Sequence, residues 1–493
     1  MTDQVVPLRV AIAGGGICGG LLARRLHLSG RGLFEVVCYE KSPKYDGPPG
    51  VNLLLNHNGI GAIRDHDEPL FQRLTEVGFE MREWAARTMS GEVLYTENVV
   101  ASGLADSIGL RARWDHFVKA IREAADEGEG AAEAADRHGL ICYNATVESY
   151  AYATDGKHVV ATVHHADGRR EKVVVDLLIA CDGRFSCVRT QVEGGALPTP
   201  DVMDVANFKF LVPDTTGGLV DDYVRVYNVP DVAALPGRFP ALAADAAFAS
   251  ECMQGLARLG VMRMKDAAHG DAVGVYGNVR ISRGGRVPDV AKTPDAMRAL
   301  FTPKGGVDAM DPLGRFLLDA LVAKAEGGDF HWERFQEATP RMRDERGHVL
   351  IIGDAAHAFC PSLGTGASLA VEDACAAAAI LCEGARAGRS VAQMVAAVEQ
   401  QRLPRAREFA QMARHHARHL AAQGDGGAAA ALAAEVADWT PGATGGTLPP
   451  GEWRAALTRM WTGWPRAEEA AASAVFRARE GAAEQRGERS SPL

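Results

Sequence analysis

The chain has 493 residues, of which 47% are hydrophobic and 24% charged, and its formal net charge is -10 at pH 7. This composition is typical of a globular protein and argues against a disordered or fibrous chain. The acidic balance argues against a general nucleic-acid binder, because phosphate contacts need clustered Lys and Arg. We therefore expect small molecules, and no nucleic acid, as partners.

The cysteines argue against a metal or disulfide framework. The chain has nine, an odd number, and they are scattered without a C-x-x-C pair. This pattern indicates neither a disulfide scaffold nor a zinc site. The first residues contain no export signal, and no apolar run is as long as the roughly 18 residues that would cross a membrane. We therefore expect a cytoplasmic protein without a metal site.

Residues 9–40 carry the most informative pattern. A short apolar run leads into glycines at Gly14, Gly16 and Gly19, an amphipathic segment follows, and a second apolar run ends on Glu40. This order predicts a strand, a tight turn, a helix and a strand, with the turn holding the pyrophosphate of a dinucleotide. Glu40 lies 21 residues after Gly19, about where a carboxylate binds ribose hydroxyls in such units, roughly 20 residues on. These residues alone leave the dinucleotide open.

The middle of the chain alternates between helical and strand-like patterns. Residues 65–96 begin with a helical pattern and end in a hairpin that turns at Ser90-Gly91. Arg111 and Arg113 precede a helix that Asp115 could cap. Residues 140–176 alternate as a β-meander of three strands, and residues 173–180 predict a buried parallel strand that ends before Asp182-Gly183.

The second half of the chain predicts another sheet and then helices. Strand-like pieces at 207–212, 223–228 and 272–281 indicate a mainly antiparallel sheet. A helical pattern covers 293–325, a buried strand covers 349–352, and a loop and a long apolar helix follow it. The remainder, from 391 to about 479, is helical by composition and spacing.

Two further strand ends carry chemistry. The first is LLIACDGRFSCVR, residues 177–189, and the second is GDAAHAFCPSLGTGASLAVEDA, residues 353–374. Together with residues 9–40, they resemble the class A flavin-dependent monooxygenases, the aromatic hydroxylases typified by p-hydroxybenzoate and salicylate hydroxylases. The resemblance implies that residues 9–40 bind the ADP half of FAD.

The resemblance also implies the fold. We expect an α/β protein in which a discontinuous Rossmann-like FAD-binding domain carries an inserted, mainly antiparallel β-sheet domain for the substrate. The expected FAD-binding domain comprises residues 1–75, 100–193 and 284–390. The substrate domain comprises 76–99 and 194–283, and a C-terminal helical region covers 391–493. This region could cover the FAD-binding domain or pair two chains, so both a monomer and a homodimer remain open.

The same resemblance assigns cofactor contacts to particular residues. Asp354 would accept a hydrogen bond from the ribityl chain, and Arg189 would help to order the pyrophosphate. Arg113 is preferred over Arg111 as the arginine near the ribityl and phosphate groups. Asp182 would contact the loop around FAD, or could instead cap a helix together with Ser186. The full set of expected FAD contacts is Gly14, Gly16, Ile17, Gly19, Glu40, Lys41, Arg113, Asp182, Gly183, Arg189, Gly353, Asp354, Pro361, Gly364, Thr365, Gly366 and Ala367.

The implied reaction uses FAD, O2 and either NADPH or NADH. The reduced flavin would form a C4a-hydroperoxide that hydroxylates an aromatic or polycyclic small molecule; epoxidation or N-hydroxylation would use the same chemistry. No second Gly-x-Gly-x-x-Gly unit serves the nicotinamide donor, which fits a donor that docks transiently. A non-hydroxylating flavoprotein that binds or sequesters a reactive ligand is the alternative.

Candidate substrate and catalytic residues come from the second sheet. A base or a hydrogen-bond relay would form the substrate phenolate, and an arginine would bind a substrate carboxylate. The candidates are Tyr223, Tyr227, His269 and Tyr276 for proton transfer, and Arg225 or Arg280 for the carboxylate.

One position departs from the family pattern, and three histidines lie close together further along the chain. Ser368 stands where the family often has Asn, which weakens any side-chain role near the flavin ring. Of His415, His416 and His419, the first and last could lie on one helical face as metal ligands, but a basic helix face is favoured because Arg414 and Arg418 lie beside them.

Overall fold

The structure is a computed structural model. It describes residues 6–44, 51–98, 109–127, 139–195, 201–220, 222–246, 248–253, 255–266, 270–280, 287, 289–328, 331–421, 429–430 and 432–433. His269 and the expected helices beyond residue 433 lie outside these residues.

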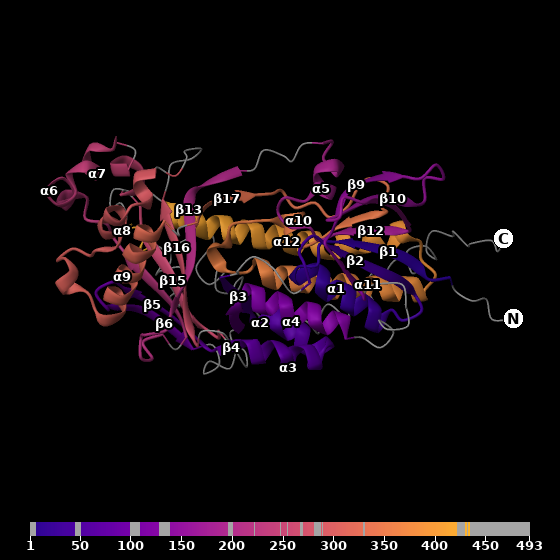
Figure 1. Ribbon diagram of the computed structural model, residues 1–493, viewed down its shortest axis with the longest axis horizontal. Coiled ribbons are helices and arrows are strands. Elements are labelled where there is room, and N and C mark those ends of the chain that lie inside the picture. Colours follow the sequence, from indigo (N-terminus) through magenta and orange to yellow (C-terminus); the bar gives the residue numbers. More distant parts are fainter. Residues whose placement is uncertain are drawn as a thin grey trace, which may run out of the picture.

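A five-stranded parallel sheet forms the first body of the molecule, on the right in Figure 1. Its strand order is β18 (Val349–Ile351), β12 (Leu177–Ala180), β1 (Leu8–Ala13), β2 (Phe34–Glu40) and β8 (Ile141–Tyr143). Helix α1 (Ile17–Ser29) follows β1 and packs on α4 (Trp114–Asp126) and α11 (Gly366–Arg386). The predicted Rossmann-like core is confirmed.

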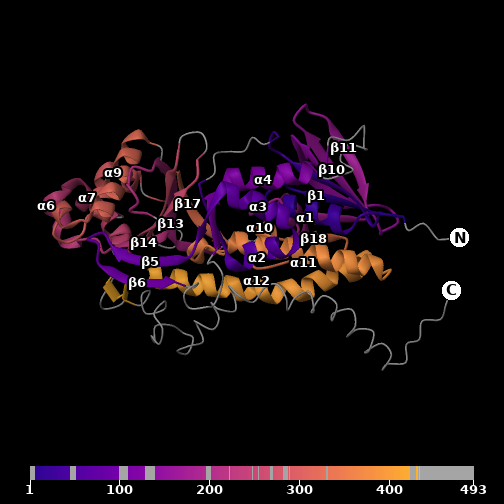
Figure 2. The same ribbon diagram turned by 90° about the horizontal axis from the view of Figure 1, so that it is seen from below.

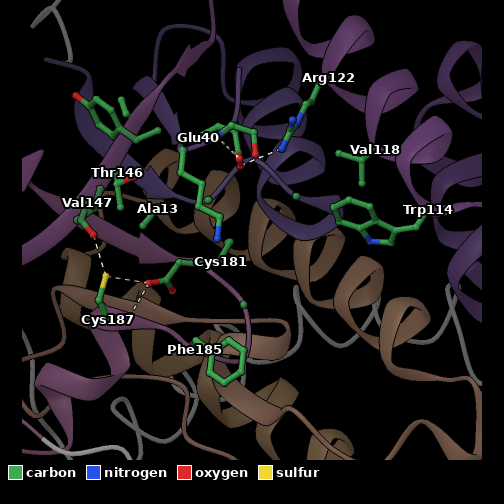
Figure 3. Close-up of a pocket in the computed structure, with 18 of the residues that line it drawn as sticks. Ala13, Glu40, Trp114, Val118, Arg122, Thr146, Val147, Cys181, Phe185 and Cys187 are labelled. Carbon is green, nitrogen blue, oxygen red and sulfur yellow. Dashed lines mark hydrogen bonds and ion pairs between the residues drawn. The ribbon is translucent and has the colours of Figure 1, made fainter. Parts of the chain in front are cut away.

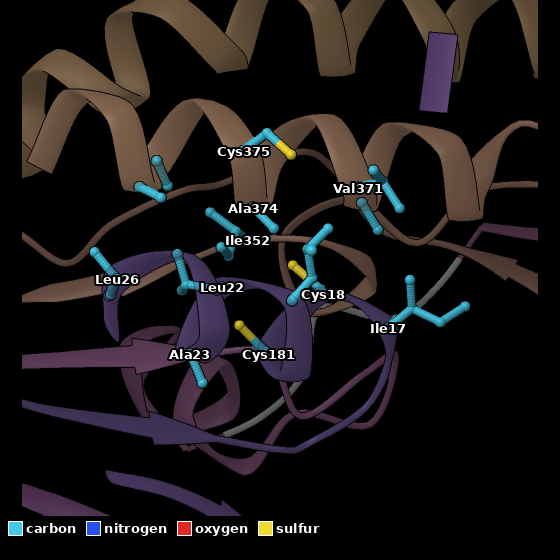
Figure 4. Close-up of a cluster of buried hydrophobic side chains, with 14 of the residues drawn as sticks. Ile17, Cys18, Leu22, Ala23, Leu26, Cys181, Ile352, Val371, Ala374 and Cys375 are labelled. Carbon is cyan, nitrogen blue, oxygen red and sulfur yellow. The ribbon is translucent and has the colours of Figure 1, made fainter. Parts of the chain in front are cut away.

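The contact of α1 with α11 is a dry, close-packed core. Figure 4 shows Leu22 and Leu26 of α1 on the side of α11 that carries Ala374, with Cys18 near the start of α1. Small residues on α11 let the two helices approach closely, as dense packing requires. This contact fixes the beginning of α1, where the predicted dinucleotide turn lies.

Smaller elements surround this body. An antiparallel sheet of β9 (Ala145–Tyr152), β10 (Val159–His165) and β11 (Arg170–Val175) forms the predicted meander. Another sheet comprises β3 (Asn52–Asn56), β7 (Gly109–Arg113) and β4 (Gly78–Met81). Helices α2 (His57–His66) and α3 (Glu68–Val77) lie between β3 and β4 in the chain. The short helices α5 (Cys187–Val192) and α10 (Asp354–His357) follow β12 and β18.

The expected strand 173–180 is two strands. Residues up to Val175 end the meander, and Leu177 starts a parallel strand beside β1. Asp176 separates them, because its carboxylate accepts a hydrogen bond from Arg9 N at 2.7 Å and pairs with the Arg9 guanidinium at 3.1 Å. An apolar run cannot reveal this change of sheet, because both strands have buried positions.

The second body is a seven-stranded sheet, on the left in Figure 1. Its order is β17 (His331–Glu337), β13 (Asp201–Pro213), β16 (Ala272–Arg280), β15 (Ala257–Met264), β14 (Tyr223–Asn228), β5 (Glu83–Thr88) and β6 (Val93–Asn98). The mainly antiparallel sheet is confirmed, and β5 and β6 form the expected hairpin with Gly91 at φ +86°.

One face of this sheet packs on α8 (Pro294–Phe301) and α9 (Pro312–Gly327). Phe208, Val224 and Val261 of the sheet share a core with Leu300 and Leu317 of these helices. Short helical segments lie at the same end of the molecule: α6 (Leu235–Arg238), α7 (Pro240–Ala244), η1 (Val232–Ala234), η2 (Phe248–Cys252), η3 (Asp289–Lys292) and η4 (Val307–Ala309).

These contacts correct the expected range 284–390 for the FAD-binding domain. Helices α8 and α9 and strand β17, which fall in that range, pack with the seven-stranded sheet instead. Their buried apolar positions gave a helical period without indicating which sheet they cover. The return to the parallel sheet occurs at β18.

Helix α12 (Val391–Ala421) connects the two bodies. In Figures 1 and 2 it runs alongside α11 and continues to the seven-stranded sheet, where it contacts β13. It also contacts η5 (Pro361–Leu363), the turn just before α11. In the described part of the chain, no helix has both the length and the apolar character that crossing a membrane requires.

Candidate functional site

The glycine turn between β1 and α1 has the geometry of a pyrophosphate site. Gly14 adopts φ +93°, and a Cβ on it would lie 2.6 Å from the Cys181 carbonyl oxygen. A Cβ on Gly19 would lie 1.9 Å from the Gly14 carbonyl oxygen, so helix and turn pack without room for a side chain. A Cβ on Gly16 would meet no atom within 4 Å. Gly14 and Gly19 are therefore required by packing. Gly16 instead borders open space at a helix N-terminus, where anions bind.

Glu40 is held rigidly beside this turn. Its Oε2 accepts a hydrogen bond from Gly15 N at 2.7 Å, and Oε1 accepts one from Ser42 N at 2.9 Å. Arg122 lies 3.0 Å from Oε2 and donates from Nε to the Gly15 carbonyl oxygen at 2.7 Å. Both side chains are buried. The ion pair thus ties strand β2, the glycine turn and helix α4 together.

Arg122 is a residue that the sequence did not reveal. It lies beside the buried positions Phe117 and Ile121 of α4, a helix whose polar residues otherwise suggest a solvated face. A charged residue next to an apolar stripe was the available signal, and only the fold shows that it reaches Glu40.

A cavity of about 490 Å³ lies in front of the turn. Figure 3 shows Glu40 and Arg122 at one end, Trp114 and Val118 on one side, and Thr146 and Val147 opposite them. Its volume is within the range of small-molecule and cofactor sites, roughly 300–1,000 Å³. The predicted residues that line it are Gly14, Gly16, Glu40, Lys41, Asp182 and Gly183. Ile17, at the start of α1, is buried next to the turn.

Asp182 both caps a helix and faces this cavity. Its Oδ2 accepts a hydrogen bond from Cys187 N at 3.0 Å, and Ser186 Oγ accepts one from Arg189 N at 2.9 Å. The capping interpretation therefore holds for one carboxylate oxygen. The other, Oδ1, is buried and has no hydrogen-bond partner among the described residues. A buried oxygen without a donor is costly unless a ligand satisfies it.

Arg189, which the resemblance places on the pyrophosphate side, is not among the residues that line the cavity. It is buried, and Nη1 donates to the Ala356 carbonyl oxygen at 2.7 Å, while Nη2 donates to that of Thr339 at 2.6 Å. Burial lowers the pKa of its guanidinium. Arg189 therefore braces α10 from within the protein. The Asp-Gly motif gave no indication of this direction.

Asp354 stands at the first position of α10, after Gly353 with φ +63°. Its side chain is solvent-accessible. The protein around it nevertheless raises the pKa of the carboxyl by desolvation, against the opposing charges of His357 and Arg184. Carboxyls with a perturbed pKa are typical of functional sites, which is compatible with the expected role of Asp354.

The loop before α11 lies next to Asp354. The carboxylate Oδ1 is 3.9 Å from where a Cβ on Gly366 would stand. Gly364 adopts φ +65°, and a Cβ there would lie 3.0 Å from Leu54, so Gly364 also serves packing. Thr365 Oγ1 is buried and has no hydrogen-bond partner among the described residues. Pro361 and Ala367 flank this loop and are half-buried.

Neither candidate arginine of β7 is free in the structure. Arg113 pairs with Asp115 and Asp266, each at 2.6 Å. Arg111 is buried and pairs with Asp222 at 3.2 Å. The choice between them as a cofactor ligand therefore stays a prediction.

The candidate substrate residues of the seven-stranded sheet share one face. Tyr223, Arg225 and Tyr227 alternate with Val224 and Val226, which pack toward α8 and α9. The other three therefore lie on the opposite face of the sheet. There Tyr223 shares a buried cluster with Leu54 and Leu363, whereas Tyr227 packs with Ala86 and Leu256. The register pairs Tyr276 with Gly260, and Gly260 with Arg225, which places Tyr276 on the same face.

These side chains form a packed aromatic and cationic layer. The Trp84 and Tyr223 rings meet edge to face with centroids 4.5 Å apart, and the Arg225 guanidinium lies 4.7 Å from the Trp84 ring centre. Tyr276 Oη donates to Asn207 Oδ1 at 2.9 Å. Arg225 and Tyr227 are buried. Their catalytic or binding roles remain predictions.

Two polar residues of α11 and α12 are buried in contacts between elements. Ser368 Oγ accepts a hydrogen bond from Asn56 N at 2.8 Å and so joins α11 to β3. His416 is fully buried, and the preceding Ala413 carbonyl accepts from Ser362 Oγ at 2.9 Å. At His416, α12 therefore faces the interior, and the side chains of His415 and His419, the candidate metal ligands, lie outside those that the structure describes.

Comparisons with known proteins agree with this arrangement. Residues 323–413 match the sequence model of a family described as an FAD binding domain. No curated protein matches the chain significantly in sequence.

Solved structures share the fold at low identity. HpxO from Klebsiella pneumoniae, complexed with FAD and uric acid, is 19% identical with a TM-score of 0.60, and the match covers 97% of this chain and 99% of that one. CtdE in complex with FAD and its substrate is 18% identical with a TM-score of 0.61, over 94% and 100% of the two chains. The 2,6-dihydroxypyridine-3-hydroxylase of Arthrobacter nicotinovorans is 15% identical with a TM-score of 0.58, over 84% and 92%. Residues 323–413 thus match an FAD binding domain, and the chain shares the fold of these FAD-complexed and hydroxylase structures, in agreement with the resemblance that its motifs carry.

Proposed function

We propose that this chain is a monooxygenase that uses FAD, O2 and NADH or NADPH to hydroxylate an aromatic or heterocyclic small molecule. Its similarity to HpxO and to the dihydroxypyridine hydroxylase supports a ring-containing substrate, since uric acid and 2,6-dihydroxypyridine are heterocycles.

We also propose a cytoplasmic location for the protein. Its nine cysteines are all free thiols, which favours a reducing compartment.

The residues present fit FAD. The open space at Gly16 and the cavity beside Glu40 suit the ADP half, and the Asp182 oxygen without a partner suits a group that donates a hydrogen bond. Asp354 and Thr365 offer an accessible carboxylate and a buried hydroxyl for the ribityl half. When bound, the flavin would supply hydride acceptance and O2 activation, which no side chain provides.

The observation that carries the proposal is the core shared by the two bodies. Trp84 and Tyr223 of the seven-stranded sheet pack in one buried cluster with Leu54 and with Leu363 of the turn before Gly364. The sheet therefore closes over the loop that is expected to hold the flavin ring. Such closure excludes water from a reactive site and strengthens electrostatic interactions there.

The protein's own task would be to orient the substrate and manage its proton. Arg225, whose guanidinium lies 4.7 Å from the Trp84 ring centre and 5.7 Å from that of Tyr223, would present a positive charge on the face opposite α8 and α9. A positive charge at this face favours an anionic substrate, either a carboxylate or a phenolate. We propose Tyr223 and Tyr276 as the phenols that relay the substrate proton, because both lie on that face.

The test is a substrate screen with two readouts. Aromatic acids, phenols and heterocyclic acids are added to FAD-loaded protein with NADH or NADPH, and both nicotinamide oxidation and product mass are measured. We expect at least one compound to stimulate oxidation and to gain one oxygen atom. Compounds that perturb the flavin spectrum but never yield a hydroxylated product would support the non-hydroxylating alternative and contradict the proposal.

A further inference from the structure

A buried cluster of charges joins α10, α11 and α12. Glu372 and Asp373 are adjacent on α11 and fully buried, and so is Arg402 of α12. Arg402 donates from Nε to Asp373 Oδ1 and from Nη2 to Glu372 Oε2, each at 2.8 Å. Arg405, one turn further along α12, donates to both oxygens of Glu372.

The second oxygen of Asp373 reaches the turn that carries Asp354. Gly353 N donates to Asp373 Oδ2 at 3.1 Å, and His357 Nε2 lies 2.5 Å from the same oxygen. A carboxylate only accepts hydrogen bonds, so this ring nitrogen carries a proton. Asp373 therefore contacts α12 through one oxygen and both ends of α10 through the other.

Helix α10 is a single turn, Asp354–His357, and it is held from two directions. Asp373 binds the residue before it and the residue that ends it. On the other side, Arg189 donates to the carbonyl oxygens of Ala355 and Ala356. Within this brace, Asp354 is the residue whose side chain remains accessible. Its direction is thus set by buried groups of α5 and α11 that hold the backbone of α10.

Stability alone does not account for such a cluster. Removing two acids and two arginines from water is costly, and apolar residues of similar size often stabilise a core as well or better. A charged group with fixed hydrogen-bond directions instead specifies one geometry. The geometry specified here is that of the turn that presents Asp354.

We propose that Asp373 and Arg402 are positioning residues for the cofactor: through them α12 sets the direction of the Asp354 carboxylate toward the ribityl half of FAD. This inference rests on the proposed FAD-dependent function. It makes the C-terminal helix a part of the cofactor site rather than a cover over it.

The neighbouring acid provides a matched control. Glu372 is as buried as Asp373 and shares Arg402 with it, but its Oε1 accepts from Asn58 Nδ2 of α2 at 2.7 Å. Glu372→Gln and Asp373→Asn each remove one buried charge from the same cluster. The two variants differ in which element they release.

The experiment compares two ligands on the apoprotein. ADP tests the cavity beside Glu40 alone, whereas FAD also tests the contact with Asp354. We expect Asp373→Asn to raise the Kd of FAD about tenfold, as expected for a disturbed buried hydrogen bond, and to leave the Kd of ADP unchanged. Asp354→Ala should give the same split, and the double variant should bind FAD no more weakly than Asp354→Ala alone. Glu372→Gln should leave both Kd values unchanged.

Results that contradict this inference differ from those that contradict the proposed function. If folded Asp373→Asn binds FAD as the wild type does, or if it loses ADP and FAD affinity equally, the cluster only holds the helices together and the inference is wrong. If Asp373→Asn does not fold, Arg402→Lys is measured in the same way, because lysine keeps the charge but cannot bridge two carboxylates with a fixed fork. Wild-type protein that binds ADP but not FAD would instead refute the proposed function.

Discussion

At the scale of single residues, the three glycines of the first turn have different tasks. Gly19 is required by packing, because a Cβ there would lie 1.9 Å from a carbonyl oxygen, whereas Gly16 has open space around it. If that space receives a pyrophosphate, a methyl group at Gly16 disturbs the ligand and not the fold.

Gly16→Ala and Gly19→Ala should therefore separate binding from stability. We expect Gly19→Ala to lower the free energy of unfolding of the apoprotein by about 1–3 kcal/mol, the usual effect of overpacking. Gly16→Ala should change it by less than about 0.5 kcal/mol, as a substitution without steric conflict does, and yet weaken FAD binding. Urea unfolding and FAD titration measure the two effects, and wild-type FAD affinity in Gly16→Ala would contradict the assignment.

The ion pair of Glu40 with Arg122 makes a second prediction. Glu40→Gln leaves the buried Arg122 guanidinium without its charge partner, which should lower the free energy of unfolding by about 3 kcal/mol. Glu35→Gln, an exposed change on the same strand, should have an effect below about 0.5 kcal/mol. Equal stability of the two variants in urea would show that the pair does not hold the turn.

At the scale of elements, the turn that carries Asp354 depends on contacts from α5 and α11. Arg189→Met removes a buried guanidinium from three carbonyl oxygens, and we expect the free energy of unfolding to fall by about 2–4 kcal/mol, since each carbonyl loses its donor. The control is Arg341→Met, which removes a half-exposed arginine that pairs with Glu193 at 3.3 Å; its effect should be below about 1 kcal/mol. If thermal or urea unfolding shows similar losses of stability in the two variants, the support of α10 by Arg189 is contradicted.

The buried Asp373 also predicts a pH dependence. His357 and Arg402 outweigh the desolvation of the carboxyl and lower its pKa from 3.8 to about 2. Because the folded-state pKa lies below the unfolded one, the carboxylate stabilises the fold above about pH 4, and this contribution disappears as the pH falls toward about 2. When the pH falls from 5 to 2.5, the free energy of unfolding of the wild-type protein should decrease by about 2 kcal/mol more than that of Asp373→Asn. Urea unfolding measures both free energies, and an equal decrease in the two proteins over this pH range would contradict the prediction.

Local patterns predicted some elements well and others poorly. Strand β14 was predicted at residues 223–228, because Tyr, Arg and Val alternate between two different faces. Strand β15 was missed, since Gly260 and the arginines at 258 and 263 hide its alternation, and β17 was missed because HWERFQE is mostly polar. The break at Asp176 depends on Arg9, a partner 167 positions away, which no local pattern contains.

The candidate site was predictable at positions where the local backbone geometry requires one particular type of residue. The glycines, Glu40 and Asp354 lie at strand ends and turns that the sequence itself marks. Arg122, Asp373 and Arg402 were not predicted as site residues, because a charged residue on an amphipathic helix usually faces water. Their function depends on which helices become neighbours, and that information is in the fold.

At the scale of the whole molecule, α12 is the element that unites the two bodies. It packs along α11, contacts the turn before the flavin loop, and reaches β13 of the seven-stranded sheet. At its far end Arg414 pairs with Glu337 of β17 at 2.7 Å. A single helix thus touches the FAD-binding elements and the sheet that we propose for the substrate, so the two sides of the reaction site share one support.

The account as a whole requires that reducing equivalents pass through a bound flavin to O2. The most direct measurement mixes FAD-loaded protein with NADH or NADPH without oxygen, in the presence of the aromatic and heterocyclic acids of the screen, and then admits O2. We predict that the visible flavin absorbance is bleached and then restored. A bound flavin that is never bleached by either nucleotide, or that stays bleached in O2, would contradict the assignment of this chain as an FAD-dependent monooxygenase.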